Sequence, residues 1–303
     1  MDTRRAASWL AWPALAAGCV ALTWLGLRRD WDGALIVAIV YLALAAALAV
    51  LERVLPHEPR WNHGDGELAH DLVFTLLGSG AGGAIAEAAV IAVWTGAASR
   101  LAAIAGRAPW PLHWPIVAQV AFTLVVADFG AYWAHRLCHE IPVLWRFHSI
   151  HHNVRRLSWL NTGRIHPIDA SITLALSMPI LILLGAPAQM MVWLASATTF
   201  IGLLSHCNVA MACGPLDRIF NTPGVHRWHH SRDRGEADSN YGENTMLWDL
   251  AFSTFLLPAV RPPADVGTQT GVPASIAGQM LAPFVRGPWF QPGLGHAGTL
   301  RPD

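Results

Sequence analysis

The sequence predicts an all-α integral membrane protein, and three observations lead to that fold class. Hydrophobic residues make up 53% of the 303 residues and charged residues only 13%, a balance that soluble domains rarely have. Four apolar segments are each long enough to cross about 30 Å of hydrocarbon as a helix. Eight of the 15 histidines fall into three tight groups next to these segments. We therefore expect membrane-spanning helices that carry a histidine-rich cap.

The four predicted spans cover residues 8–27, 34–51, 71–98 and 115–134. We interpret the first as a retained helix and not a signal peptide, because its apolar run continues to Leu27. A fifth apolar run, residues 172–204, is too long for one ordinary span and is interrupted at Gly185-Ala186-Pro187. It therefore predicts a hairpin of two helices. A hairpin returns the chain to the face it left, so the histidines before and after it would share one side.

Arginines near the span ends set the predicted orientation. They gather after the fourth span, at residues 136–164, and after the hairpin, at residues 218–234, which places both regions and the metal site on the cytosolic side. The 20 arginines are balanced by 20 acids, and no basic patch suggests a nucleic-acid partner. We expect a multi-pass membrane protein with no nucleic-acid function.

The histidine groups have the spacing of metal ligands. Residues three or four apart lie on one helical face, where two imidazoles can reach the same ion, and neutral imidazole suits iron, zinc and copper. Eight or more ligands exceed the four that zinc takes or the six of octahedral iron, so the count indicates two metals. The groups are one HxxxH motif and two HxxHH motifs: His135 and His139; His148, His151 and His152; His226, His229 and His230.

Three further residues are candidates for the same site. His206 ends the second hairpin arm, where it is expected to complete the ligand set. His166 precedes a proline, and its residue type leaves open whether it binds metal or supports a ligand. Asp128 lies on one helical stripe with His135 and His139; an acid in a membrane helix is costly, so we expect it to orient an imidazole, the alternative being support of helix packing.

A nitrogen-only ligand set at the ends of membrane spans indicates chemistry on lipids. A pair of redox metals can reduce O2 and break an unactivated C–H bond, which side chains alone cannot do, and zinc has no redox chemistry. The string DFGAYWAHRLCHEIPVLWRFHSIHHNVRRLSWLNTGRIHP and the later NTPGVHRWHHSRDRGEADSNYGENTMLWDLAFSTF resemble the membrane-bound fatty acid hydroxylase and sterol desaturase superfamily. The resemblance covers residues 70–258, which we expect to form the catalytic domain, after N-terminal helices and a loop (1–69) and before an irregular Pro/Gly-rich tail (259–303).

This resemblance implies a non-haem di-iron monooxygenase that hydroxylates or desaturates a lipid or sterol-like substrate. It implies that the motif histidines and His206 bind two iron ions, with O2 as co-substrate and a separate ferredoxin- or cytochrome b5-like electron donor. Zinc is a second metal that the site can hold in purified protein. Relatives often read FGT where this chain has Phe252-Ser253-Thr254, and some carry a histidine at the place of Ala210. We favour hydroxylation over desaturation; a metal-binding membrane protein without redox chemistry is the alternative class. Candidates to support the ligands are Asp128, Asn161, Asp169, Glu243 and Asp249, and Trp159 is a candidate to line a lipid channel.

Overall fold

The computed structural model describes residues 3–268 and 272–285, and in these residues it is all-helical. The described residues contain no β-strand, only three isolated bridges such as Pro56 with Val209. Six helical segments are long and apolar enough to cross a membrane. They are α1 (Thr3–Arg28), α2 (Gly33–Val54), the continuous segment of α3 (Leu68–Phe74), η2 (Thr75–Gly82) and α4 (Gly83–Ala105), then α5 (Ile116–Glu140), α7 (Pro167–Leu184) and α8 (Ala188–His206).

All the predicted apolar segments form helices. Asp32 begins α2, because its carboxylate accepts hydrogen bonds from the backbone N–H groups of Ala34 and Leu35. The predicted segment 71–98 is part of a longer helix, residues 68–105, that widens to π geometry over η2. The assignment of the first four segments as spans, and of the last two as a hairpin inside the membrane, stays a prediction.

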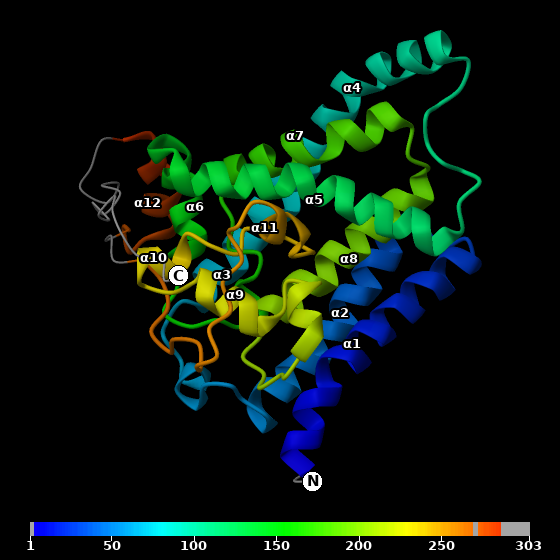
Figure 1. The fold of residues 1–303 in the computed structure, drawn as a ribbon. Coiled ribbons are helices and arrows are strands. Elements are labelled where there is room, and N and C mark those ends of the chain that lie inside the picture. The colour runs from blue at the N-terminus through cyan, green and yellow to red at the C-terminus, as the bar shows by residue number, and fades with distance from the viewer. Residues whose placement is uncertain (1–2, 269–271, 286–303) are drawn as a thin grey trace.

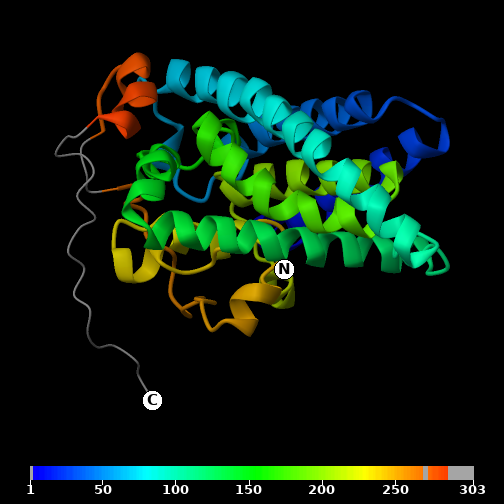
Figure 2. The same cartoon turned by 90° about the horizontal axis from the view of Figure 1, so that it is seen from above.

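The long helices pack in two groups (Figures 1 and 2). One core lies between α1, α2 and α8 and includes Val40, Leu48 and Leu204, all fully buried. The other lies between α5, α7 and α8, with α4 packed on α7. Glycine permits the closest approaches: a Cβ at Gly130 of α5 would lie 2.1 Å from the carbonyl oxygen of Leu176 in α7. The histidine-bearing segments are held at one end of this bundle.

The predicted hairpin is present, and its two arms, α7 and α8, diverge from the turn that joins them. Gly185 ends α7 in the left-handed conformation, at φ 72°, and Pro187 precedes α8. The two arms then pack on different neighbours, α7 on α4 and α5, and α8 on α1 and α2. Both arms nevertheless return toward the same end of the bundle, where α7 begins beside Asp169 and α8 ends at His206.

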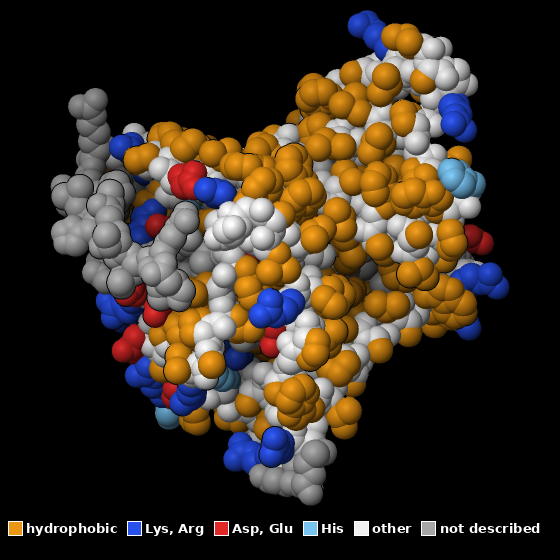
Figure 3. Space-filling model, viewed as in Figure 1, with side chains coloured by type: hydrophobic (Ala, Val, Ile, Leu, Met, Phe, Trp, Pro, Cys, Tyr) orange, Lys and Arg blue, Asp and Glu red, His pale blue; other side chains and the backbone are white. Residues whose placement is uncertain are grey.

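The outer surface of the bundle is apolar. Figure 3 shows a broad band of hydrophobic side chains, with charged side chains gathered toward the ends of the molecule. Ile85, Ile104 and Val117, in α4 and α5, expose 72%, 86% and 76% of their surface. Six helices of this length and apolar composition indicate a multi-pass membrane protein.

Short helices and loops form the cap at the histidine end. They are η1 (Pro59–Asn62), α6 (Pro142–His152), η3 (Trp159–Asn161), η4 (Gly214–Arg218), α9 (Pro223–His229), α10 (Arg234–Ala237), α11 (Leu247–Ala251), α12 (Ile276–Leu281) and η5 (Ala282–Phe284). The sequence predicts an irregular tail over 259–303, whereas the structure shows α12 there, fixed by a 3.1 Å hydrogen bond from Arg164 to Gln279. Residues 286–303 lie outside the described part.

Candidate metal centre

Nine histidines converge into two groups, although they come from four separate helices, α5, α6, α8 and α9, and the residue that follows α9. The ligand nitrogens within each group lie within 4.8 Å of one another. The first group is His135, His139, His148, His152 and His229; the second is His151, His206, His226 and His230. Each HxxHH motif therefore contributes to both groups. Rings from the two groups also contact each other, as His152 and His230 stack with centroids 4.5 Å apart.

In the five-histidine group, four of the five rings have an oxygen partner at Nδ1 that fixes the tautomer. Nδ1 of His148 lies 2.9 Å from Asp169, and Nδ1 of His139 lies 3.0 Å from Asp238. The other two contacts are to backbone carbonyls: Nδ1 of His135 with Tyr241 O at 2.9 Å, and Nδ1 of His229 with Ser239 O at 2.8 Å. An imidazole that donates from Nδ1 keeps the Nε2 lone pair for a ligand.

The inward nitrogens of this group are arranged as metal ligands are. The Nε2 atoms of His135, His148 and His229 are buried and have no hydrogen-bond partner in the described structure. Nε2 of His139 faces Nε2 of His152 at 3.1 Å. Buried polar atoms normally have a partner, so several lone pairs directed at one point fit a bound cation. The donor set fits iron on this ground.

The four-histidine group joins the end of α8 to α9. Nε2 of His226 lies 2.8 Å from Nε2 of His206 and 3.1 Å from Nε2 of His230. Arg227, fully buried between the motif histidines, donates to the carbonyl oxygens of Cys207 and Val209 at 2.8 and 2.9 Å. This guanidinium ties α9 to the chain that leaves α8, and it thereby sets the position of the second group.

Burial keeps the cap histidines neutral. It lowers their pKa values well below the usual range, and neighbouring imidazoles lower them further, because a proton on one ring repels a proton on the next. Neutral imidazole is the form that binds metal, so the lone pairs are available at physiological pH. The residues are His151, His152, His226, His229 and His230.

Two of the predicted acids, Asp128 and Asp249, hold a loop whose carbonyl oxygens contact two of the histidines. Asp128 accepts hydrogen bonds from the backbone N–H groups of Asn244 and Thr245, at 3.2 and 2.5 Å, and from the Asn244 side chain. Asp249 accepts from the N–H groups of Tyr241 and Gly242, at 2.8 and 2.7 Å. The loop that they hold supplies the carbonyl contacts to His135 and His229. The sequence predicts that Asp128 orients an imidazole directly, whereas these hydrogen bonds all go to the loop.

Of the remaining predicted site residues, Asn161 contacts a histidine group and His166 does not belong to one. Asn161 touches the second group, with Oδ1 3.3 Å from Nδ1 of His206. His166 belongs to neither group: Nδ1 accepts from Ile168 N–H at 3.1 Å and begins α7, and Nε2 lies 3.2 Å from the Met280 carbonyl. Glu243 is partly buried near Asp128 and Asp169, and burial raises its pKa to about 7. Sequence reasoning missed Asp238, whose carboxylate contact has no motif to mark it.

Comparison with known proteins identifies the family to which the chain belongs. The family model described as fatty acid hydroxylase matches residues 120–254, which include all nine histidines. The ornithine lipid hydroxylase OlsE of Rhizobium tropici is 43% identical over 284 residues, 93% of this chain and 85% of that protein. The chain belongs to the fatty acid hydroxylase family. The resemblance seen in the motifs is thus confirmed, and the relative named as a lipid hydroxylase supports an oxidoreductase.

More distant relatives match about half of this chain. Human alkylglycerol monooxygenase is 34% identical over 147 residues, and the matched part is 32% of its length. The protein of the same name from Danio rerio is 32% identical over 147 residues. No solved structure matches the chain significantly.

Proposed function

We propose that this family member hydroxylates a membrane lipid at a pair of iron ions held by the two histidine groups. The observation that carries the proposal is the convergence of nine histidines, eight of them buried and several with unpartnered ring nitrogens, in a chain of the fatty acid hydroxylase family. O2 would be the co-substrate, and electrons would come from a separate donor protein. We place the site at the cytosolic ends of the helices because the arginine-rich segments lie there.

Ornithine lipid is the first candidate substrate. The relative named an ornithine lipid hydroxylase aligns with 93% of the chain, whereas the alkylglycerol monooxygenases align with about half of it. Residues outside the motifs, which shape a substrate pocket, are therefore shared more fully with the former. An ornithine lipid combines acyl chains with an amino-acid headgroup, which suits a site between an apolar bundle and a polar cap.

The residues of the chain have distinct parts in this chemistry. Bound iron supplies the ability to reduce O2 and oxidise a C–H bond. Asp169 and Asp238 accept the Nδ1 protons of His148 and His139, which keeps the opposite nitrogens directed inward. The 239–245 loop does the same for His135 and His229 through its carbonyl oxygens. Burial of the groups excludes bulk water, which limits loss of a reactive oxidant to side reactions.

Lipid mass spectrometry under isotopically heavy O2 tests the proposal. Cells that make ornithine lipid would express the intact protein, the variant His151→Ala, or the matched control His113→Ala, whose histidine is exposed in a loop. We expect one heavy oxygen atom in a lipid from intact protein and control, and none from His151→Ala. Purified His151→Ala should also carry less iron per chain.

Other outcomes would contradict parts of the proposal. Loss of two hydrogens without label would indicate desaturation by the same centre. Identical lipids from all three strains, with iron bound normally by the intact protein, would favour a metal-binding protein without redox chemistry. Full activity and iron content in His151→Ala would overturn the assignment of the second histidine group.

A further inference from the structure

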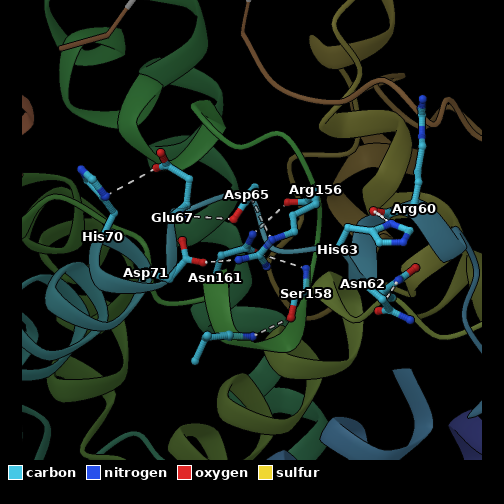
Figure 4. Close-up of polar contacts among 12 residues, drawn as sticks. Arg60, Asn62, His63, Asp65, Glu67, His70, Asp71, Arg156, Ser158 and Asn161 are labelled. Atoms are coloured by element: carbon cyan, nitrogen blue, oxygen red, sulfur yellow. Dashed lines mark hydrogen bonds and ion pairs between the residues drawn. The ribbon is translucent and has the colours of Figure 1, made fainter. Parts of the chain in front are cut away.

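Two adjoining pockets lie beside the metal centre, in the region that Figure 4 shows. Their volumes are about 280 and 190 Å³, and they share the walls formed by Trp61, His63 and Arg156. The larger pocket is bounded by the last turn of α2, including Glu52 and Arg53, by the chain around η1, and by the segment before η3. We call the two together the Trp61 pocket.

The lining of the Trp61 pocket is polar and well ordered by ion pairs. Arg156 lies between Asp65 and Asp71, at 2.9 and 3.0 Å, and Figure 4 shows this arrangement with Ser158 alongside. Glu52 accepts hydrogen bonds from Ser158 Oγ and from the backbone N–H of Trp159, at 3.0 and 2.8 Å. An acyl chain placed here would strip water from these groups without replacing its hydrogen bonds. The pocket therefore fits a polar ligand.

Two arginines give the Trp61 pocket an excess of positive charge. Arg53 lines the larger lobe and donates only to its own helix, at the Ala49 carbonyl oxygen, 2.7 Å away. Arg155 lines the smaller lobe and is exposed. Within the described residues, neither guanidinium has a carboxylate within ion-pair distance. A guanidinium recognises a carboxylate or a phosphate through paired hydrogen bonds, so the free ligand group that fits is an anion.

The position of the pocket indicates a lipid as the source of that anion. Arg53 lies in the last turn of an apolar helix long enough to span a membrane, and Trp61 and Trp159 lie beside it. Tryptophan and arginine at such a helix end are typical of the headgroup level of a bilayer. A lipid whose acyl chains contact the apolar helix surface would carry its headgroup to this depth.

One wall of the Trp61 pocket leads directly to the metal centre. Ser158 and Trp159 line the pocket, and the backbone N–H of Ser158 donates to Oδ1 of Asn161 at 3.1 Å. The same Oδ1 lies 3.3 Å from Nδ1 of His206 in the second histidine group. Only the short η3 turn thus separates the pocket wall from a candidate ligand.

We propose that the Trp61 pocket binds the anionic group of the substrate headgroup, which is the carboxylate in an amino-acid lipid, and that Arg53 and Arg155 select for it. This inference rests on the proposed lipid hydroxylation and adds its headgroup specificity. Because both side chains are at the surface, their replacement should leave the fold and the metal centre intact.

The test compares an ornithine lipid with its methyl ester, which has the same chains but no headgroup carboxylate. Native mass spectrometry of the purified full chain in detergent would measure binding of each lipid to wild type and to Arg53→Gln/Arg155→Gln. We expect wild type to bind the free acid at least tenfold more tightly than the ester, and the double variant to bind both equally, because charge-assisted hydrogen bonds are lost. Arg100→Gln/Arg107→Gln removes the same charge at the end of α4 and should behave as wild type.

Turnover of the same lipids separates this inference from the proposed function. If wild type prefers the free acid in binding but hydroxylates neither lipid, the pocket assignment stands and the proposed function fails. If both lipids are hydroxylated at equal rates and bound equally, the function stands and the pocket assignment is wrong. Two further outcomes would overturn the headgroup assignment. One is that Arg100→Gln/Arg107→Gln loses the preference for the free acid over the ester as fully as Arg53→Gln/Arg155→Gln does. The other is that millimolar inorganic phosphate displaces the acid and the ester equally.

Discussion

Asp169 lies 2.9 Å from Nδ1 of His148, and both side chains are buried. The histidine belongs to α6 and the carboxylate to the first turn of α7, so the contact joins the predicted hairpin to the first HxxHH motif. A carboxylate behind a metal-binding imidazole holds the ring in one orientation and raises its basicity.

Replacement of Asp169 by asparagine should weaken metal binding. The amide has about the same size but no charge to pair with the Nδ1 proton, so we expect roughly a 10- to 100-fold loss of metal affinity. Metal content per chain during titration with iron measures this loss. Glu140→Gln, which changes an exposed carboxylate at the end of α5, should bind iron normally. Equal iron binding by both variants would show that Asp169 does not support the ligand.

The 239–245 loop should depend on Asp249. Its carboxylate holds the N–H groups of Tyr241 and Gly242 and the Thr254 hydroxyl, and Asp249→Ala would leave these donors buried without a partner. We expect a loss of about 3 kcal/mol in the free energy of unfolding, together with reduced iron content, because the loop orients His135 and His229. Thermal melting in detergent measures the first effect. Asp233→Asn, at an exposed helix start, should change the melting temperature little.

Ser253 occupies a backbone conformation that favours glycine. Its φ is 58°, in the left-handed region that glycine adopts without a steric penalty. We expect Ser253→Gly to stabilise the protein by about 1 kcal/mol, because the strain of a left-handed side-chain-bearing residue disappears. Ser99→Gly, inside α4, should have the opposite sign in the same melting experiment, by about 0.5 kcal/mol. A lower melting temperature for Ser253→Gly would contradict this account.

His57 should contribute to acid sensitivity. Burial, together with the nearby guanidinium groups of Arg227 and Arg261, lowers the pKa of His57 to about 3. The pKa of His57 is thus lower in the folded state than in the unfolded chain. Its contribution to the free energy of unfolding is therefore complete above about pH 6.5 and is lost as the pH falls toward 3. Between pH 7.5 and 5.0 this group accounts for a loss of about 2 kcal/mol. Melting at both pH values should show a smaller decrease for His57→Gln than for wild type or for the exposed-site control His113→Gln.

Residue type and spacing were enough to predict the helices and the convergence of the motif histidines. The interruption at Gly185 and Pro187 indicated where the long apolar run turns, and His206 was expected where the structure places it, in the second group. That these histidines bind iron stays a prediction. The hydrogen bonds that orient the histidine rings could not be predicted from residue type. Tyr241 and Ser239 contribute backbone carbonyl oxygens, which every residue type has.

The roles of Asp128 and His166 could not be read from neighbouring residues. Asp128 shares a helical stripe with His135, but its partners are more than 110 positions away, in a loop whose placement depends on the whole cap. His166 has the residue type of a ligand, yet the proline after it begins α7 and directs Nδ1 to the helix start. Spacing along one element identifies a shared face but not what the fold brings to it.

The open hairpin makes the spacing between the two candidate metal sites depend on the whole bundle. The far end of α7 carries Asp169, which contacts the first histidine group, and the far end of α8 carries His206 of the second group. The two arms diverge from Gly185. A helix of 18 residues, such as α7, is roughly 27 Å long. A small change of angle at that turn would become a larger change of distance between the two histidine groups at the far ends of the arms. Substitutions on the apolar outer face, remote from every site histidine, can therefore alter how the two histidine groups are placed relative to each other.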